Sequence, residues 1–232
     1  MGKNLLCMVP ARAGSERLPG KNLLDLAGKP MIAYTIEAAL QADRFDGVYV
    51  CTEDAQIAEV AERHGAQVPY LMPPELCGPL VSSHEPCLHL VDWLAERGTP
   101  AEGLVCLQPT SPLRSAADIR AGVARFEQGD VDFVVSITPI DPHYFHWAVA
   151  PDADGSWRMY FRDQYMLERP LLPAVYRPNG SIKIARLPAL RAVGHFFGPR
   201  LGVVETPEER SVHVATRFDF DLCELLLRRR DP

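Results

Sequence analysis

The sequence predicts an α/β fold with a mostly parallel, mixed sheet flanked by helices. Short apolar runs rich in β-formers alternate with helical patterns along most of the 232 residues, as they do in parallel sheets. One of these runs, "VDFVVSI" (131–137), is almost continuously hydrophobic, which suits a strand covered on both faces. Because 47% of the residues are hydrophobic, the chain can fill one core, and we expect a single domain over residues 1–232.

Two strand and helix pairs open the chain. The strand "LLCMVP" (5–10) precedes a helix in "PMIAYTIEAAL" (30–40), where Pro30 suits the first helical position. The strand "DGVYVCT" (46–52) precedes a helix in "DAQIAEVAERHG" (54–65). Both helices carry apolar residues at helical spacing, so both are expected to pack on the sheet.

The later part of the chain repeats this alternation. "GLVCLQP" (103–109) is a predicted strand, followed by a helix from about 115 to 128. The predicted strands "GSIKIA" (180–185) and "LGVVET" (201–206) come before a terminal helix in "FDFDLCELLLRRR" (218–230). In sheets of this kind ligands bind beyond the carboxyl ends of the strands.

The alternation breaks from about residue 140 to 176. The interrupted segment is rich in aromatic residues, namely Tyr144, Phe145, Trp147, Trp157, Tyr160, Phe161 and Tyr165. A long surface loop that packs its rings locally is one interpretation. We favour an inserted arm that packs on a second subunit, because exposed aromatic clusters mark interfaces. The expected assembly is a homodimer.

Charge and composition exclude several classes of partner. The formal net charge is -6, with 30 acidic and 24 basic residues, whereas general nucleic-acid or membrane-surface binders need broad positive fields. No apolar run approaches the roughly 20 residues of a membrane span, and "LLCMVP" is too short for a signal peptide. The six cysteines form no CxxC pair. We therefore expect reduced thiols, a cytoplasmic location, and neither nucleic acid nor membrane as partner.

The loop "ARAGSERLPGKN" (11–22) is the strongest candidate for a ligand site. It leaves a buried strand, enters a helix, and carries Arg12, Arg17 and Lys21. Backbone N–H groups at such a turn can bind phosphate oxygens. The loop differs from a Walker A motif, because five residues separate Gly14 from "GKN". A solvated turn is the alternative, but position and charge density favour a polyphosphate site.

Five stretches carry a resemblance to a known family. They are "MVPARAGSERLPGKNLLDLAGKPMIAYTIEAAL" (8–40), "FDGVYVCTEDAQIAEVAERHGAQVPYL" (45–71), "LQPTSPLRSAADI" (107–119), "LPAVYRPNGSIKIA" (172–185) and, more weakly, "ERSVHVATRFDFDLCELL" (209–226). Together they resemble bacterial acylneuraminate cytidylyltransferases, the CMP-sialic acid synthetase family. "RLPGK" is also similar to 3-deoxy-manno-octulosonate cytidylyltransferases.

The resemblance implies a Rossmann-like fold of the nucleotide-diphospho-sugar transferase type. It also implies transfer of the cytidylyl group of CTP to the anomeric hydroxyl of a nine-carbon acidic sugar, with release of pyrophosphate. A sialic, legionaminic or pseudaminic acid, or another acidic ketose, fits this expectation equally. A transferase for another base, and a binding protein without turnover, remain open alternatives.

The resemblance also assigns residues to the nucleotide. Arg12, Ser15 and Lys21 hold the triphosphate, with Arg12 and Lys21 as catalytic residues, and Asn22 belongs to the same motif. The stretch "VSSHEP" (81–86) lies where the family reads cytosine, so Ser82 and Ser83 are candidates. Capping of a helix by either serine explains them as well.

For the sugar, the resemblance points to Gln108, Arg114, Arg169, Tyr176 and Asn179. Arg114 suits a sugar carboxylate through its planar guanidinium group, although a surface ion pair would explain it too. The family carries glutamine directly after the arginine at position 169, and this chain has Pro170 there.

The metal motif departs from the family. The family pattern "SxDxDTxxD" corresponds to "SVHVATRFD" (211–219), so His213 and Ala215 stand where two aspartates are expected. Mg²⁺ (or Mn²⁺) is the implied cofactor, and carboxylates are its usual protein ligands. Three explanations stay open: an ion held by nucleotide and water with Asp219 or Asp221, a softer ion on His213, or lost catalysis.

Overall fold

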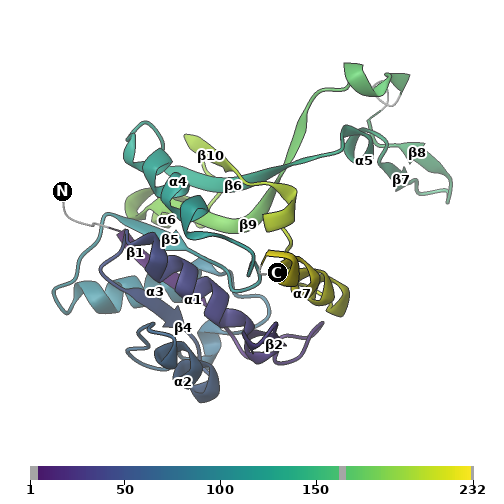
Figure 1. The fold of residues 1–232 in the computed structure, drawn as a ribbon. Coiled ribbons are helices and arrows are strands. Elements are labelled where there is room, and N and C mark those ends of the chain that lie inside the picture. Colours follow the sequence, from purple (N-terminus) through teal and green to yellow (C-terminus); the bar gives the residue numbers. More distant parts are fainter. Residues whose placement is uncertain (1–4, 162–165, 231–232) are drawn as a thin grey trace.

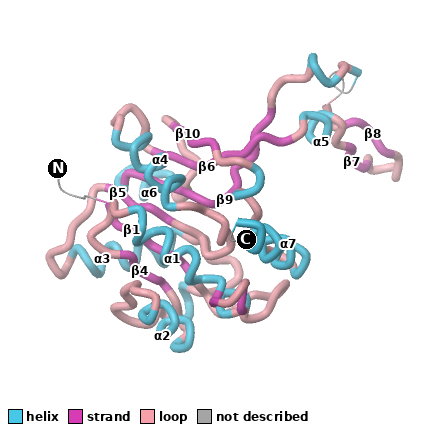
Figure 2. The backbone as a smooth tube through the Cα atoms, in the orientation of Figure 1, coloured by secondary structure: helices cyan, strands magenta, loops and turns pink. Residues whose placement is uncertain are grey.

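The computed structural model of the chain describes residues 5–161 and 166–230 (Figures 1 and 2). Tyr165 of the predicted aromatic cluster lies outside these residues. Among the helices that the structure describes, none has the length and apolar character that crossing a bilayer requires.

A six-stranded sheet forms the centre of the fold, in the order β10-β6-β9-β5-β1-β4. Its strands are β1 (Leu5–Pro10), β4 (Val48–Cys51), β5 (Gly103–Cys106), β6 (Phe133–Ile140), β9 (Val175–Arg186) and β10 (Leu201–Glu205). β9 runs antiparallel to β5 and β6, while the other neighbouring strands are parallel. The predicted α/β class with a mostly parallel, mixed sheet is confirmed.

Helices cover both faces of this sheet (Figure 1). The helices that the structure describes are α1 (Met31–Ala42), α2 (Ala55–Arg63), α3 (His84–Ala95), α4 (Ala116–Glu127), α5 (Pro142–His146), α6 (Leu187–Val193) and α7 (Arg217–Arg230), of which α5 lies apart from the sheet, on a projecting arm. One buried cluster joins α1, α2 and α4 to the sheet, and another joins α3 and α6 to its opposite face. α7 packs separately on the short strand β2 (Asp25–Leu26), which pairs with β3 (Lys29–Pro30).

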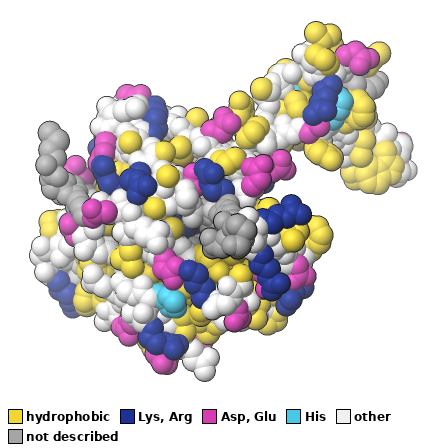
Figure 3. All heavy atoms as spheres, in the orientation of Figure 1, with side chains coloured by type: hydrophobic (Ala, Val, Ile, Leu, Met, Phe, Trp, Pro, Cys, Tyr) yellow, Lys and Arg dark blue, Asp and Glu magenta, His cyan; other side chains and the backbone are white. Residues whose placement is uncertain are grey.

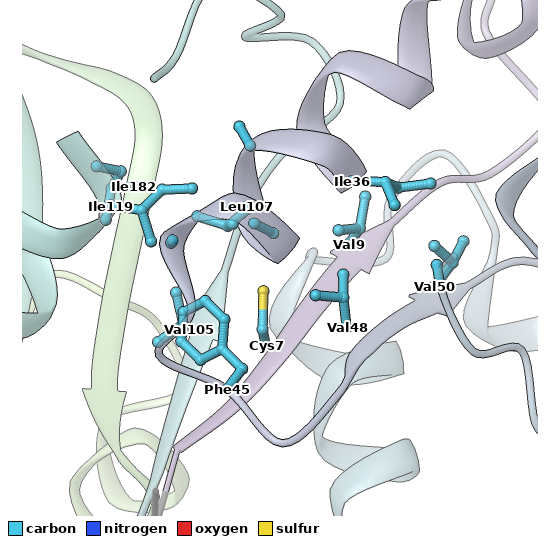
Figure 4. Packing of buried hydrophobic residues seen from close by; sticks show 14 of the residues in the cluster. Cys7, Val9, Ile36, Phe45, Val48, Val50, Val105, Leu107, Ile119 and Ile182 are labelled. Atoms are coloured by element: carbon cyan, nitrogen blue, oxygen red, sulfur yellow. The ribbon is translucent and has the colours of Figure 1, made fainter. Parts of the chain in front are cut away.

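The buried cluster under α1 and α4 shows why the opening strand was so clear in the sequence (Figure 4). Cys7 and Val9 of β1 lie in it beside Val105 of β5, and Ile36 of α1 packs on the same cluster. All four side chains are fully buried. Burial raises the pKa of the Cys7 thiol well above its usual value, so this thiol is protonated.

An arm leaves the body where β6 and β9 continue as a two-stranded ribbon, down to the pair Ile140 and Val175 (Figures 1 and 2). It carries α5, the hairpin β7 (Val149–Pro151) and β8 (Trp157–Met159), and η4 (Arg169–Leu171). Some rings pack locally, as Phe145 does on Phe161 with centroids 4.5 Å apart. Others stay open to solvent, and hydrophobic side chains gather at the end of the arm in Figure 3.

Candidate functional site

A cavity of about 500 Å³ opens at the carboxyl ends of β1, β4 and β5. It is lined by Pro10 and the loop 11–22 at the end of β1, Cys51 at the end of β4, the segment 76–86 that leads into α3, residues 108–110 after β5, and His213. The cavity lies at the edge of the sheet where an open α/β fold is expected to bind its ligands.

Backbone contacts fix the loop 11–22 against the sheet. Ala11 donates its N–H to the carbonyl of Cys51 at 2.8 Å, and Ala13 donates to Oε1 of Glu53 at 2.9 Å. Gly20 has a φ of 64°, a left-handed conformation that glycine adopts without strain, and the 3-10 helix η1 (Lys21–Leu23) begins directly after it. The loop therefore presents its side chains from a fixed backbone.

The cations of this loop face the cavity together. Arg12, Arg17 and Lys21 all line it, with Ser15 between them. Nζ of Lys21 lies 3.5 Å from the carbonyl oxygen of Val214. Burial lowers the pKa of Lys21, and the neighbouring arginines lower it further. Such a concentration of positive charge favours a polyanionic ligand.

Arg12 and Asn22 show how the loop meets the opposite wall. Arg12 donates from NH1 to the carbonyl oxygen of Gly78 at 2.6 Å, and its own carbonyl accepts from Nδ2 of Asn22 at 3.0 Å. Oδ1 of Asn22 is buried without a hydrogen-bond partner in the part of the chain that is described. An acceptor left unpaired in this way needs a donor, which a water molecule or a ligand group would supply.

Ser82 and Ser83 both line the cavity, at the start of α3. Ser83 occupies the N-cap position of α3 but makes no capping bond with its side chain. The Ser82 hydroxyl pairs instead with Nδ1 of His84 at 2.7 Å. Capping by these hydroxyls therefore does not explain them, and contact with a nucleotide base stays a prediction.

Gln108, Thr110 and His213 form the wall beside the β5 end. Nδ1 of His213 lies 3.2 Å from Oγ1 of Thr110, and Val214 donates its N–H to the Thr110 carbonyl at 2.7 Å. Burial lowers the pKa of His213, and so do the nearby Lys21 and Lys183. Gly180 has a φ of 73° and lies behind Gln108 and His213, so its backbone conformation accounts for the glycine.

Arg114 occupies a different position from the one the resemblance implied. It is 4% exposed and does not line the cavity. Its guanidinium donates from Nε to the Ser181 carbonyl at 2.8 Å and from NH2 to the Gln108 carbonyl at 2.7 Å. NH1 reaches Oγ1 of Thr35 at 3.2 Å. These bonds direct the guanidinium into the protein, where it positions the strand ends.

Asn179 likewise lies inside the protein rather than on the cavity surface, because its side chain completes a buried network. Nδ2 donates to the hydroxyls of Thr206 at 2.6 Å and Ser211 at 3.1 Å, and Oδ1 accepts from Ser136 at 2.5 Å. Asn179 is 4% exposed. The network ties β9 to β6 and to the loop that carries His213.

Arg169 and Tyr176 lie toward the arm. Arg169 forms an ion pair with Asp141, with NH2 and Oδ2 2.9 Å apart. Tyr176 is opposite Pro139 in the ribbon, and its side chain is 45% exposed. Neither residue lines the cavity of its own chain, so their predicted role at the sugar is not met within this subunit.

The predicted metal ligands do not assemble a magnesium site. Oδ2 of Asp219 accepts from the N–H groups of Ala215 and Thr216 and from the Thr216 hydroxyl, while Asp219 donates its own N–H to that hydroxyl. This reciprocal capping box starts α7. Asp221 is exposed and paired with Arg217. No three His, Cys, Asp or Glu side chains within residues 5–161 and 166–230 converge as metal ligands. The donor set does not fit Mg²⁺.

The segment 76–81 was not predicted from the sequence to be part of the site. Nothing in "LCGPLV" marks it as a cavity wall, because its position depends on Arg12 of a distant loop.

Comparison with known proteins adds independent findings. A family model described as "Cytidylyltransferase" matches residues 6–145. The CMP-N,N'-diacetyllegionaminic acid synthase of Legionella pneumophila is 34% identical over 228 residues, covering 96% of each chain. The N-acylneuraminate cytidylyltransferase of Streptococcus agalactiae is 34% identical over 217 residues, 93% of this chain and 51% of that protein. The chain thus spans about half the length of that relative.

A solved structure extends the comparison to the fold. A CMP:2-keto-3-deoxy-manno-octonic acid synthetase complexed with CTP superimposes with a TM-score of 0.75 and 17% identity. The match covers 97% of this chain and 99% of the other. At this level of identity the likeness establishes the shared fold alone.

Proposed function

The chain belongs to the cytidylyltransferase family, within its acylneuraminate (CMP-sialic acid synthetase) group, and we propose that it transfers the cytidylyl group of CTP to an acidic nine-carbon sugar. The observation that carries the proposal is the convergence of Arg12, Arg17 and Lys21 on one cavity at the carboxyl edge of the sheet. The product would be a CMP-sugar, and pyrophosphate would leave.

The proposed chemistry depends on positioning and on electrostatics. The anomeric hydroxyl attacks the α-phosphorus in line with the bond to pyrophosphate, and negative charge develops on the leaving group. Lys21 and Arg12 would neutralise that charge from fixed positions, which costs no reorganisation during the reaction. Lys21 serves as a compact point charge, whereas Arg12 can bind two oxygens at once.

The acidic sugar would bind beside the nucleotide, against Gln108, Thr110 and His213. The two curated relatives above carry the names of neuraminic and legionaminic acid activities. We propose the shared class, a nonulosonic acid, because these sugars differ only in substituents that a few pocket residues distinguish.

A divalent ion belongs to the proposal only as a companion of the substrate. Magnesium is commonly held by substrate phosphates and water together with one or two carboxylates. Since the described residues offer no carboxylate cluster at the cavity, Mg²⁺ or Mn²⁺ would enter with CTP. We assign no step of the reaction to a protein-held ion.

The arm supports a proposed homodimer. Tyr144, Trp157 and Leu171 are 85%, 68% and 67% exposed on a segment that projects from the body (Figure 3). Exposed apolar groups on this scale suit a subunit interface. Sedimentation velocity of the wild type should give a dimer, and Trp157→Asp should shift it toward the monomer; a wild-type monomer at micromolar concentration contradicts the proposal.

A nucleotide or sugar binder without turnover is the second candidate. The observation that favours it is the substitution of both expected aspartates, by His213 and Ala215, in the loop that faces Lys21.

We also propose that the cytidylyltransferase is located in the cytoplasm, because the reaction needs a supply of CTP.

Pyrophosphate release tests the proposal directly. Purified protein is assayed with each of the four nucleoside triphosphates, a panel of nonulosonic acids, and Mg²⁺, Mn²⁺ or EDTA. Sugar-dependent release with CTP is the expected result. Release with another triphosphate identifies a different nucleotidyltransferase, while CTP binding without release under any condition establishes the binding protein.

A further inference from the structure

Lys183 is a cation in the middle of β9 that the nucleotide site does not use. It is paired with Cys106 of β5. Directly opposed residues of antiparallel strands point to the same face, and Cys106 packs with Cys87 in the core under α3 and α6. Lys183 is partly buried. No hydrogen bond or ion pair with any described residue reaches its ammonium group.

One aromatic ring lies near this ammonium group, and its charge influences two histidines. Its nitrogen lies 5.7 Å from the centroid of the Phe196 ring. The positive charge of Lys183 also lowers the pKa of two histidines. For His213, burial is the largest cause of the lowered pKa, Lys21 the second and Lys183 the third. Burial also lowers the pKa of His84, with His195 and Lys183 adding to it. His213 lines the cavity, and His84 follows the lining residue Ser83.

The register places Lys183 next to the sugar wall. Gln108 comes two residues after Cys106, so it lies about 7 Å further along the strand direction. A lysine side chain can span such a distance. Lys183 does not line the cavity in this structure, so its side chain would have to extend along the strand toward Gln108 for the ammonium group to meet a ligand there.

The carboxylates that act on these histidines are already engaged. Glu85 accepts from the N–H of Ser82 at 2.8 Å through Oε1, and Asp219 accepts the N–H groups at the start of α7. A partly buried cation without a counter-ion is costly, and the cost is recovered when an anion binds. Lys183 is thus a vacant partner for a negative group.

We propose that Lys183 binds the carboxylate of the acidic sugar; this inference rests on the proposed function. The triphosphate has its own cations in Arg12, Arg17 and Lys21 at the loop after β1. A single ammonium group matches a monoanion better than a polyphosphate. Arg114, the residue expected to bind this carboxylate, has its guanidinium bonded to protein atoms.

The experiment compares Lys183→Met, Lys183→Arg and the wild type in steady-state kinetics. Lys29→Met is the matched control, because Lys29 pairs with Glu37 away from the cavity. For Lys183→Met we expect KM for the sugar acid to rise about 10- to 100-fold, the usual effect of losing a charge-assisted hydrogen bond. KM for CTP should stay unchanged, and Lys183→Arg should recover part of the loss.

A second measurement separates a direct contact from a structural effect. Binding of the sugar acid and of its uncharged methyl ester is measured by calorimetry in the presence of a non-hydrolysable CTP analogue. The wild type should prefer the acid by about 10- to 100-fold, and Lys183→Met should lose that preference while binding the ester as the wild type does.

Each remaining outcome overturns the inference. An unchanged sugar KM in Lys183→Met does so, as does an equal rise of the KM for CTP, which would place the lysine at the triphosphate. Retained preference for the acid in Lys183→Met does so even if activity falls. Absence of turnover by the wild type with every acid overturns the proposed function first and this inference with it, so the two failures are distinguishable.

Discussion

Two loops meet at the cavity, and they differ in where their charged side chains are directed. The loop 11–22 carries three cations that line the cavity. The loop 211–219 has His213 and Ala215 in place of two acids, and its remaining acid, Asp219, is turned onto the start of α7. The loops still touch, through Lys21 and the carbonyl of Val214.

The difference teaches that the two halves of the site are separable. We expect the cationic half to attract an anion by itself, because its charged side chains all come from one loop whose backbone is held against the sheet. The other half keeps its folding role, since a capping box needs only Thr216 and Asp219. Folding constraints preserve that acid whether or not the loop binds metal.

The largest effect is expected in the first loop. Lys21→Ala should lower kcat/KM for CTP about 10³-fold, since removing a fixed charge-stabilising group costs on this scale. Steady-state assays of pyrophosphate release measure it, with Lys29→Ala as the control. Activity near that of the wild type in Lys21→Ala would falsify the assignment of this loop to the triphosphate.

A second effect is expected at Arg114, which joins β9 to the segment after β5 from inside the protein. Burial lowers the pKa of Arg114 to about 10. Arg114→Ala removes the side-chain donors to the carbonyls of Ser181 and Gln108, and among the described residues only the Gln108 carbonyl keeps another donor, the N–H of Ser111. We therefore expect the free energy of unfolding to fall by about 3 kcal/mol. Urea denaturation measures it, and the exposed Arg120→Ala is the control. A stable variant with a selective rise in the sugar KM would instead make Arg114 a direct ligand.

Restoring the acids of the second loop tests whether it can hold an ion again. The double variant His213→Asp with Ala215→Asp should bind Mn²⁺ at least about tenfold more tightly than the wild type without nucleotide, since carboxylates suit this class of ion. Calorimetry measures the affinity, with His213→Asn as the control. Tight Mn²⁺ binding by the wild type would contradict the view that the loop 211–219 has lost its metal ligands.

The smallest effect is expected at Asp219. Asp219→Ala removes one half of a capping box, which should lower the free energy of unfolding by about 1 kcal/mol. Asp221→Ala is the control, because Asp221 makes only an exposed pair with Arg217, worth less than about 0.5 kcal/mol. The metal dependence of any activity should not change in Asp219→Ala. A large change in the metal concentration that gives half-maximal activity would show instead that Asp219 is a metal ligand.

Much of the fold could be predicted because its signals are local. Apolar runs such as 5–10 and 131–137 are buried on both faces, and their composition alone distinguishes them from half-exposed strands. The helix after Ser115 begins with a capping box between Ser115 and Asp118. The antiparallel direction of β9 had no such signal, because residue pattern does not encode strand direction.

The candidate site divides in the same way. The cations of 11–22 were predictable because one short loop holds them all. Arg114 and Asn179 were placed at the sugar, yet each forms hydrogen bonds with partners from several distant segments, among them Thr35 and Thr206. Sequence separation of this size hides whether a polar side chain has its partners inside the protein.

By itself the sequence determined the α/β class and the family and singled out the cationic loop 11–22, since each depends on residues that lie close together along the chain. Only the tertiary structure decided which polar groups remain available to a ligand. Arg114 and Asp219 have their hydrogen-bonding capacity directed to protein atoms, whereas Lys183 and Oδ1 of Asn22 have no such partner among the described residues. Hydrogen-bond capacity is filled by neighbours in space, and folding chooses those neighbours.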